Sequence, residues 1–164
     1  MVVVSDTSPI TNLAAVGRLD LLKTLYAQVT LPEELRDELV LGGSGNNPGA
    51  QEVLTSGWFV VISVDAQQRD QLAHTYRALD IGEAAALALA VARNANLILL
   101  DDRAARDAAQ ALHLNYIGVV GVLLAAKSRG LIPLVKPLLD DLRALAGFRL
   151  AETVYQAALR AASE

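Results

Sequence analysis

Leu97-Ile98-Leu99-Leu100-Asp101-Asp102-Arg103 is the stretch of sequence that decides the fold class. Its four consecutive apolar residues predict a strand that is buried on both faces, as the strands of parallel sheets are. The acidic pair ends this strand in a polar turn, and we expect a helix from Arg103 to about Leu112. A strand that leads directly into a helix is the repeating unit of α/β proteins.

Val2-Val3-Val4 followed by Ser5-Asp6-Thr7-Ser8-Pro9 repeats this pattern near the start of the chain. The β-branched run predicts a strand. We expect Ser8 to cap the next helix and Pro9 to occupy its first turn, with the helix ending near residue 16. Asp6 and Asp101 therefore take the same place, each shortly after a buried strand.

Strands and helices alternate along the rest of the chain. Further strands are expected at residues 28–31, 58–64 and 115–117. Further helices are expected at residues 19–26, 32–41, 50–56, 83–93, 118–127, 134–145 and 152–161, with one more after Asp65. This alternation predicts an α/β fold, a three-layer α/β/α sandwich around a central parallel sheet. Because no repeat and no interdomain linker is visible, residues 1–164 are expected to form a single domain.

The composition is that of a compact globular protein, with 53% hydrophobic and 20% charged residues. The longest apolar runs, such as residues 117–126, fall short of the ~20 residues that a membrane-spanning helix needs. No basic region precedes the short apolar run at the start, so no signal peptide is visible, and the absence of cysteine excludes disulfides and thiolate metal sites. We expect a cytoplasmic protein with no membrane contact.

The surplus of apolar residues predicts a buried homodimer face or a groove for a partner. The net charge of −4 argues mildly against a broad nucleic-acid footprint, which usually shows as an excess of basic residues. Bound cations would offset part of this charge locally.

Asp6 and Asp101 are the first candidate site residues, because ligands bind beyond the carboxyl ends of parallel strands. Two carboxylates on adjacent strands repel each other by about 4 kcal/mol at a separation of about 4 Å and an effective dielectric constant of about 20. Such a pair needs a counter-charge or a shared proton. No histidine or lysine lies beside either motif. We therefore expect a divalent cation, and oxygen ligands favour Mg²⁺ or Mn²⁺ over zinc.

Glu83 and Glu38 are weaker candidates. Glu83 stands in the first turn of its expected helix beside Gly82, which permits a close approach, although a glutamate there can simply complement the helix dipole. Glu38 stands late in its helix, where a negative charge is electrostatically disfavoured, yet it can also be an ordinary solvated charge. Asp102 is expected to cap the helix that follows it.

Other nucleotide or phosphate chemistries fit the sequence less well. The glycine-rich stretch 42–49 has no Lys-Ser or Lys-Thr ending and does not directly follow a strand, which argues against a P-loop. A phosphoryl-transfer domain of the receiver or haloacid type also places Asp at strand ends, but the lysine or threonine that it requires after later strands cannot be placed. His74 and His113 show no ligand-like spacing.

Four acidic motifs occur along the chain in a definite order. They are Val4-Ser5-Asp6-Thr7-Ser8-Pro9-Ile10, then Leu31-Pro32-Glu33 leading to Glu38, then Gly82-Glu83-Ala84, and then Leu99-Leu100-Asp101-Asp102-Arg103. Their order and contexts resemble PIN-domain proteins, and the similarity extends through Ile117-Gly118 and residues 127–133 to Gly147-Phe148-Arg149-Leu150. The chain is similar to a prokaryotic PIN-like branch related to VapC-type toxin ribonucleases.

The resemblance implies a metal-dependent ribonuclease, with Mg²⁺ or Mn²⁺ held by Asp6, Glu83 and Asp101. Glu38 matches the second acidic position of the family, so all four carboxylates are expected in the catalytic metal site. Thr7 or Ser8 matches a hydroxyl residue that supports the first Asp, and Asp102 is a further acidic participant. Many toxin members carry a further acidic residue a few places after the strand Asp, and in that stretch this chain offers only Asp107.

Two functions follow from the resemblance. The first is an endoribonuclease that hydrolyses phosphodiesters of an RNA substrate, as the toxin of a toxin–antitoxin pair with a protein antitoxin. The alternative is a catalytically weak or inactive PIN-like domain that acts as a protein- or nucleic-acid-binding module.

Overall fold

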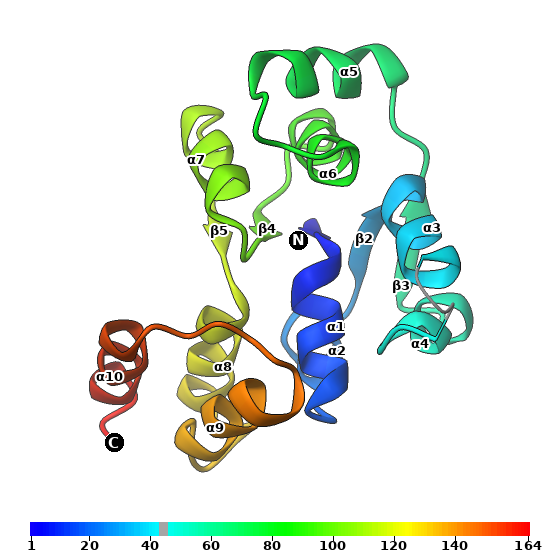
Figure 1. Ribbon diagram of the computed structural model, residues 1–164. Coiled ribbons are helices and arrows are strands. Elements are labelled where there is room, and N and C mark those ends of the chain that lie inside the picture. Colours follow the sequence, from blue (N-terminus) through cyan, green and yellow to red (C-terminus); the bar gives the residue numbers. More distant parts are fainter. Residues whose placement is uncertain (43–45) are drawn as a thin grey trace.

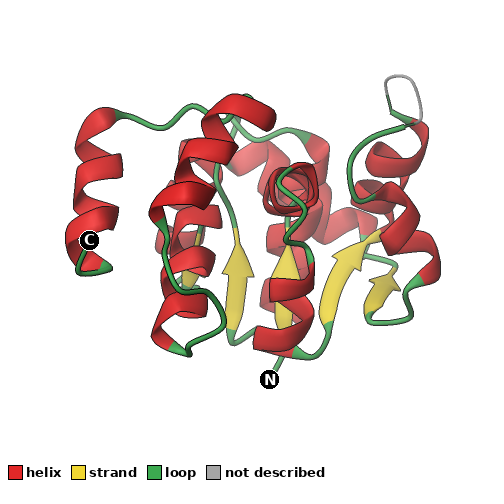
Figure 2. Cartoon of the chain, turned by 90° about the horizontal axis from the view of Figure 1, so that it is seen from below, coloured by secondary structure: helices red, strands yellow, loops and turns green. Residues whose placement is uncertain are grey.

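A single parallel sheet organises the computed structural model, which describes residues 1–42 and 46–164. Within these residues five strands are hydrogen-bonded in the order β3-β2-β1-β4-β5 (Figures 1 and 2). The strands are β1 (Val3–Ser5), β2 (Val29–Pro32), β3 (Phe59–Ile62), β4 (Leu97–Leu99) and β5 (Tyr116–Ile117). All four pairings are parallel. The expected α/β class with a central parallel sheet is confirmed.

Side chains that alternate along each strand divide the core into two halves. Val3 and Leu99 belong to one hydrophobic cluster, whereas Val4 and Ile98 belong to the other. The first cluster is completed by helices on one face of the sheet: α1 (Thr7–Ala15), α2 (Asp20–Tyr26), α8 (Val119–Ser128), α9 (Lys136–Leu145) and α10 (Glu152–Ala161). The second is completed by α6 (Ile81–Ala92) and α7 (Arg103–Ala111). The sheet is thus covered on both faces, as expected for three layers (Figure 1).

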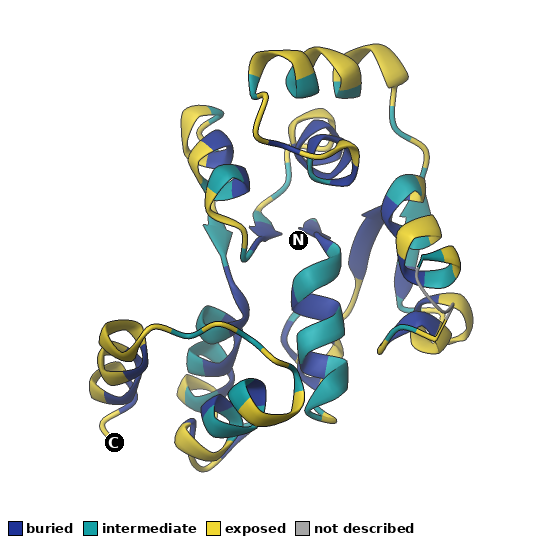
Figure 3. Ribbon diagram, in the orientation of Figure 1, coloured by how far each residue is buried: buried dark blue, intermediate teal, exposed yellow. Residues whose placement is uncertain are grey.

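The alanine-rich helix α6 is the more deeply buried of the two helices that complete the second cluster (Figure 3). Its residues 84–90 are all buried, and the small side chains let the helix axis approach the sheet closely. The helix contacts β1, β2 and β4 on one side and α5 (Ala66–Thr75) on the other. It also packs against α3 (Glu33–Leu41), which contacts α4 (Ala50–Thr55). Helix α6 therefore connects the central strands of the sheet to α3 and α5.

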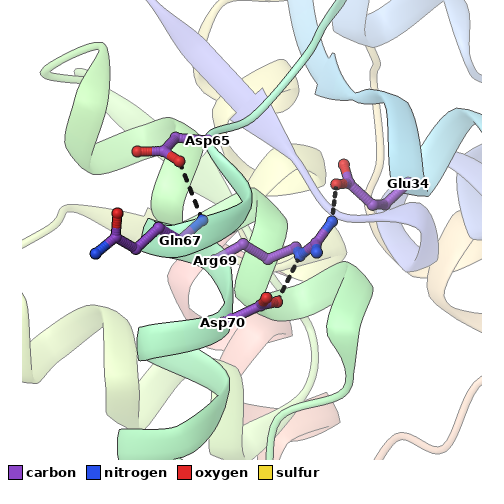
Figure 4. Close-up of polar contacts among 5 residues, drawn as sticks. All are labelled: Glu34, Asp65, Gln67, Arg69 and Asp70. Carbon is purple, nitrogen blue, oxygen red and sulfur yellow. Dashed lines mark hydrogen bonds and ion pairs between the residues drawn. The ribbon is translucent and has the colours of Figure 1, made fainter.

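A polar network joins α5 to α3 (Figure 4). Arg69 Nη1 donates to Glu34 Oε1 at 2.7 Å, and Arg69 Nε donates to Asp70 Oδ1 at 3.0 Å. Asp65 accepts from the backbone N–H of Gln67 at 3.0 Å and caps α5, the helix expected after it. Because the Glu34 and Arg69 side chains are both largely shielded from solvent, this pair holds α5 in place more firmly than a surface ion pair would.

Two helices begin earlier than expected. Helix α1 begins at Thr7, with Asp6 at the capping position in extended backbone and no side-chain cap, so the prediction that Ser8 caps this helix is wrong. Ser8 is already helical, and its hydroxyl accepts from Asn12 Nδ2 at 3.1 Å. Helix α6 begins at Ile81 instead of residue 83, because Asp80 caps it and draws the preceding turn into the helix.

At most of the other element ends, the observed boundary differs from the expected one by one or two residues. Strand β3 is shorter than residues 58–64, and α9 begins at Lys136 instead of residue 134. Of the expected glycine-rich loop 42–49, residues 43–45 lie outside the described residues. In the part of the chain that is described, none of the helices is both long and apolar enough to cross a membrane.

Glu164 links the C-terminal helices. Its carboxylate accepts from Lys127 Nζ at 2.8 Å and from the backbone N–H groups of Val135 and Lys136 at 2.7 and 3.0 Å. It therefore serves the start of α9, whose own capping residue offers no side-chain bond. The Lys127 ammonium, followed by these N–H donors, lowers the pKa of Glu164 to about 2.

We predict that Glu164→Gln lowers the thermal unfolding temperature at pH 7, because the charge-assisted bonds to α9 are weakened. The pKa is about 2 in the folded protein against an ordinary 4.5, so the stabilisation is complete above pH 4.5 and is lost as pH falls through about 2. Thermal scans should show the difference between variant and wild type shrinking over that range. Glu52→Gln, at an exposed position on α4, is the matched control. A constant difference at every pH would contradict this account.

Candidate active site

Asp6 and Asp101 lie at the carboxyl edge of neighbouring strands. Strand β1 pairs with β4 so that Ser5 lies opposite Leu99, and the ladder continues with the Asp6 N–H donating to Leu99 O at 3.0 Å. The expectation that the strands bearing the two aspartates lie side by side is therefore confirmed.

Asp6 is the most perturbed acid at this edge. Asp6 is only 6% exposed, and burial is the main cause that raises its pKa from 3.8 to about 7. The backbone N–H of Thr7 donates to the carboxylate and opposes the rise, whereas repulsion from Glu83, Asp80 and Glu38 adds to it. These three carboxylates thus share one electrostatic neighbourhood with Asp6.

Asp80 and Glu83 form a reciprocal cap at the start of α6. Asp80 Oδ1 accepts from the Glu83 N–H at 2.7 Å, and Glu83 Oε2 accepts from the Asp80 N–H at 2.9 Å. Burial is the largest cause that raises the pKa of Glu83, and repulsion from Asp80, Asp102 and Glu38 adds to it. The sequence reasoning missed Asp80, although an Asp three residues before a Glu at a helix start is a capping-box signal that could have found it.

Glu38 joins this group through helix packing. Thr7 Oγ1 donates to Glu38 Oε1 at 3.2 Å, which connects α1 to α3. A Cβ atom on Gly82 would lie 3.0 Å from Glu38 Oε2 and 2.5 Å from Leu35 Cδ2, so a larger residue would require these side chains to shift where α6 approaches α3. The close approach expected at Gly82 is confirmed. Glu38, near the end of α3, is thus hydrogen-bonded to α1.

Asp101 is held separately from the other acids. Its Oδ1 accepts from the Val119 N–H at the start of α8 at 2.9 Å, and Arg106 Nη2 lies 3.6 Å from the same oxygen. Its side chain is 7% exposed, and its Oδ2 is buried with no hydrogen-bond partner. Burial raises the pKa of Asp101, while the Val119 N–H, the Arg106 charge and the nearby Ser8 hydroxyl oppose that rise.

Arg106 places a positive charge beside Asp101. Its Nε donates to Leu100 O at 2.9 Å, which fixes the guanidinium beside the end of β4. A Cβ atom on Gly118 would overlap both Arg106 Nη2 and Asp101 Oδ1. The missing side chain of Gly118 therefore leaves the room in which Asp101 and Arg106 meet.

The three supporting residues expected from the sequence, Thr7, Ser8 and Asp102, make different contacts. The Thr7 hydroxyl binds Glu38, while its backbone N–H serves Asp6. Ser8 lies near Asp101. Asp102 accepts from the Ala105 N–H at 3.0 Å and caps α7, as expected.

The acids are neighbours but do not form a preassembled metal centre. Within residues 1–42 and 46–164, no three His, Asp or Glu side chains converge on one point. Glu83 is engaged in its cap, and Asp101 Oδ1 is engaged by Val119. The unpartnered Asp101 Oδ2 and the crowding of carboxylates around Asp6 nevertheless fit a hard divalent cation, which takes oxygen ligands.

We predict that Asp6→Asn stabilises the metal-free protein at pH 8. Because the folded-state pKa of about 7 exceeds the ordinary 3.8, the contribution of Asp6 to stability is fully present below pH 3.8 and is lost as pH rises through 7. The asparagine variant avoids this loss, which is on the order of a few kcal/mol at most. Urea unfolding in EDTA should show the variant gaining over wild type between pH 4 and 8. Asp141→Asn on α9 is the control, and an equal gain for it would refute the explanation.

The fold and the acidic edge agree with the comparison against known families. A family model described as a PIN domain matches residues 2–164. No curated protein matches the sequence. PIN domains are typically nucleases, and this match includes all four of the acidic motifs with their strand and helix contexts. The chain belongs to the PIN-domain family.

Proposed function

We propose that this protein is a metal-dependent ribonuclease that hydrolyses phosphodiesters with Mg²⁺ or Mn²⁺. Asp6, Glu38, Glu83 and Asp101 would hold the cation. The observation that carries this proposal is the buried Asp101 Oδ2, which has no hydrogen-bond partner at the same sheet edge as the crowded Asp6 carboxylate. A buried acceptor without a partner is costly, and a bound cation would satisfy it.

Electrostatics supports a cation at this edge. Asp6 is surrounded by Glu38, Asp80 and Glu83, and their repulsion favours its protonated form. A divalent cation reverses this preference, because the ion is then the largest local charge. In the Asp80–Glu83 cap, the bond from the Asp80 N–H to Glu83 Oε2 would compete with metal ligation by that oxygen.

The residues would divide the work of hydrolysis by their placement. A bound cation supplies a lowered pKa for the attacking water and neutralises charge on the phosphoryl group. Asp6 and Asp101 are set by the ends of two paired strands, so they anchor the site. Glu38 is exposed and oriented by Thr7, which suits it to take the proton of the water as the P–O ester bond breaks. The leaving oxygen then takes a proton from solvent.

We further propose that residues 1–164 act as one cytoplasmic domain in a VapC-like toxin–antitoxin pair, as a homodimer. The family resemblance supports the toxin role. Exposed apolar side chains support a protein-contact surface, and those in the C-terminal part are Leu134, Leu145 and Val154.

The second candidate is a binding module without activity. It is favoured by the lack of three converging His, Asp or Glu side chains among the described residues and by the net charge of −4. This candidate predicts that the acidic edge neither binds a cation nor supports cleavage.

We predict that Mn²⁺ or Mg²⁺ raises the unfolding temperature of the wild-type protein and that EDTA reverses the rise. Because protons compete with the cation for Asp6, the rise should be larger at pH 8 than at pH 6. Differential scanning calorimetry should show the rise nearly absent in Asp6→Asn and Asp101→Asn and retained in Asp141→Asn. An equal rise in all four proteins would indicate nonspecific ion binding and count against the site.

We predict that purified protein cleaves single-stranded RNA with Mn²⁺ or Mg²⁺ and not with EDTA. Asp6→Asn and Asp101→Asn should each lose roughly a hundredfold or more of the rate, because each removes a ligand set by a strand end. Thr7→Val should lose roughly tenfold, since it only orients Glu38. Gel assays should show Asp141→Asn as active as wild type. Equal persistence of RNA with wild type and Asp6→Asn would favour the binding module.

A further inference from the structure

Arg106 stands out as a basic side chain built into an acidic edge. Repulsion links Asp6, Glu38, Asp80, Glu83 and Asp102 at this edge. Asp101 stands apart from them, and the Arg106 guanidinium beside it opposes the burial-driven rise of its pKa. A polyanion that approaches these carboxylates meets repulsion, which a bound cation and the Arg106 guanidinium would each reduce locally.

The guanidinium is fixed in place by the fold. Arg106 Nε donates to Leu100 O at 2.9 Å, and the space for the head group exists because Gly118 has no side chain. An arginine that is already held loses little conformational entropy when it binds a ligand. Its position is therefore prepared before any substrate arrives.

The Asp101 contact does not use the full capacity of this side chain. The separation between Arg106 Nη2 and Asp101 Oδ1 is 3.6 Å, which is longer than a good hydrogen bond, and the Arg106 side chain remains 39% exposed. By contrast, Arg69 is engaged at short distances by both Glu34 and Asp70 (Figure 4). The Arg106 side chain is thus partly exposed and only loosely paired at the edge where Asp101 lies.

We propose that Arg106 binds a phosphate of the nucleic-acid strand next to the carboxylate site and so positions the substrate. The proposal rests on the proposed nuclease function and names a contact for it. Guanidinium N–H groups match two phosphate oxygens at once, which an ammonium group does not do. The recognised chemistry is the phosphodiester anion, which single-stranded RNA and DNA share.

The test measures binding without cleavage. Fluorescence anisotropy follows a short labelled single-stranded RNA, and a DNA of the same sequence, in CaCl₂ over a range of salt concentrations, with gels to verify that the strands stay intact. The proteins are wild type, Arg106→Gln, Arg106→Lys and Arg93→Gln. Arg93 is exposed at the opposite end of α6, so its variant makes the same change in net charge away from the site.

Arg106→Gln should bind roughly tenfold more weakly than wild type, with a salt dependence of log K reduced by roughly 0.7. Arg106→Lys should keep the salt dependence, since the charge remains, but lose part of the affinity. Arg93→Gln should match wild type, and RNA and DNA should respond alike. A purely structural role for Arg106 would not change the salt dependence.

Three results would overturn the proposal: an unchanged salt dependence in Arg106→Gln, an equal loss in Arg93→Gln, or no binding by the wild type at low salt. These results are independent of cleavage. If binding depends on Arg106 while Mn²⁺ and Mg²⁺ support no hydrolysis, the contact stands and the proposed nuclease function fails. If the wild type cleaves RNA but Arg106→Gln keeps both affinity and salt dependence, the nuclease function stands and the contact fails.

Discussion

Burial of carboxylates, several of which also repel one another, is the main physical constraint at the carboxyl edge of the sheet. Asp6 is buried there with three other acids close enough to raise its pKa further, to about 7. Holding like charges together costs free energy that the rest of the fold must offset. The large apolar core on both faces of the sheet offsets this cost. The same core packs the strands and helix starts that carry the acids.

Each acid is restrained by a different local device. Asp80 and Glu83 bind each other's backbone at the start of α6, and Glu38 accepts from Thr7. Asp101 accepts from the Val119 N–H at the start of α8. Each of these bonds fixes a carboxylate to its own local backbone or helix, and within residues 1–42 and 46–164 no three His, Asp or Glu side chains converge on one point. Cation binding would exchange some of these bonds for metal ligation.

Two glycines matter because they bring charged groups together. Gly82 lets α6 meet α3 beside Glu38, and Gly118 leaves space for Asp101 and Arg106. Neither has a positive φ that would by itself require glycine. Their importance lies in the space that a side chain would occupy.

The sequence by itself determined the fold class and the places of Asp6 and Asp101, because apolar runs that end in an Asp report directly on buried strands. It also located Glu83 near a helix start and Asp102 as a cap, since capping is local along the chain. The start of α1 was predicted wrongly, because whether Ser8 or Asp6 precedes the first turn depends on the backbone conformation between β1 and the helix.

Only the tertiary structure decided which acids share a neighbourhood and what neutralises them. Thr7 and Glu38 are 31 residues apart, and Asp101 and Val119 are 18 apart, so neither bond is visible along the chain. The charge of Asp80 acts on Asp6 because α6 begins at the same sheet edge. Arg106 lies beside Asp101 because its Nε is hydrogen-bonded to Leu100 O. The physical reason is that electrostatic energy depends on distance and burial in space, whereas sequence patterns report only on local backbone preference.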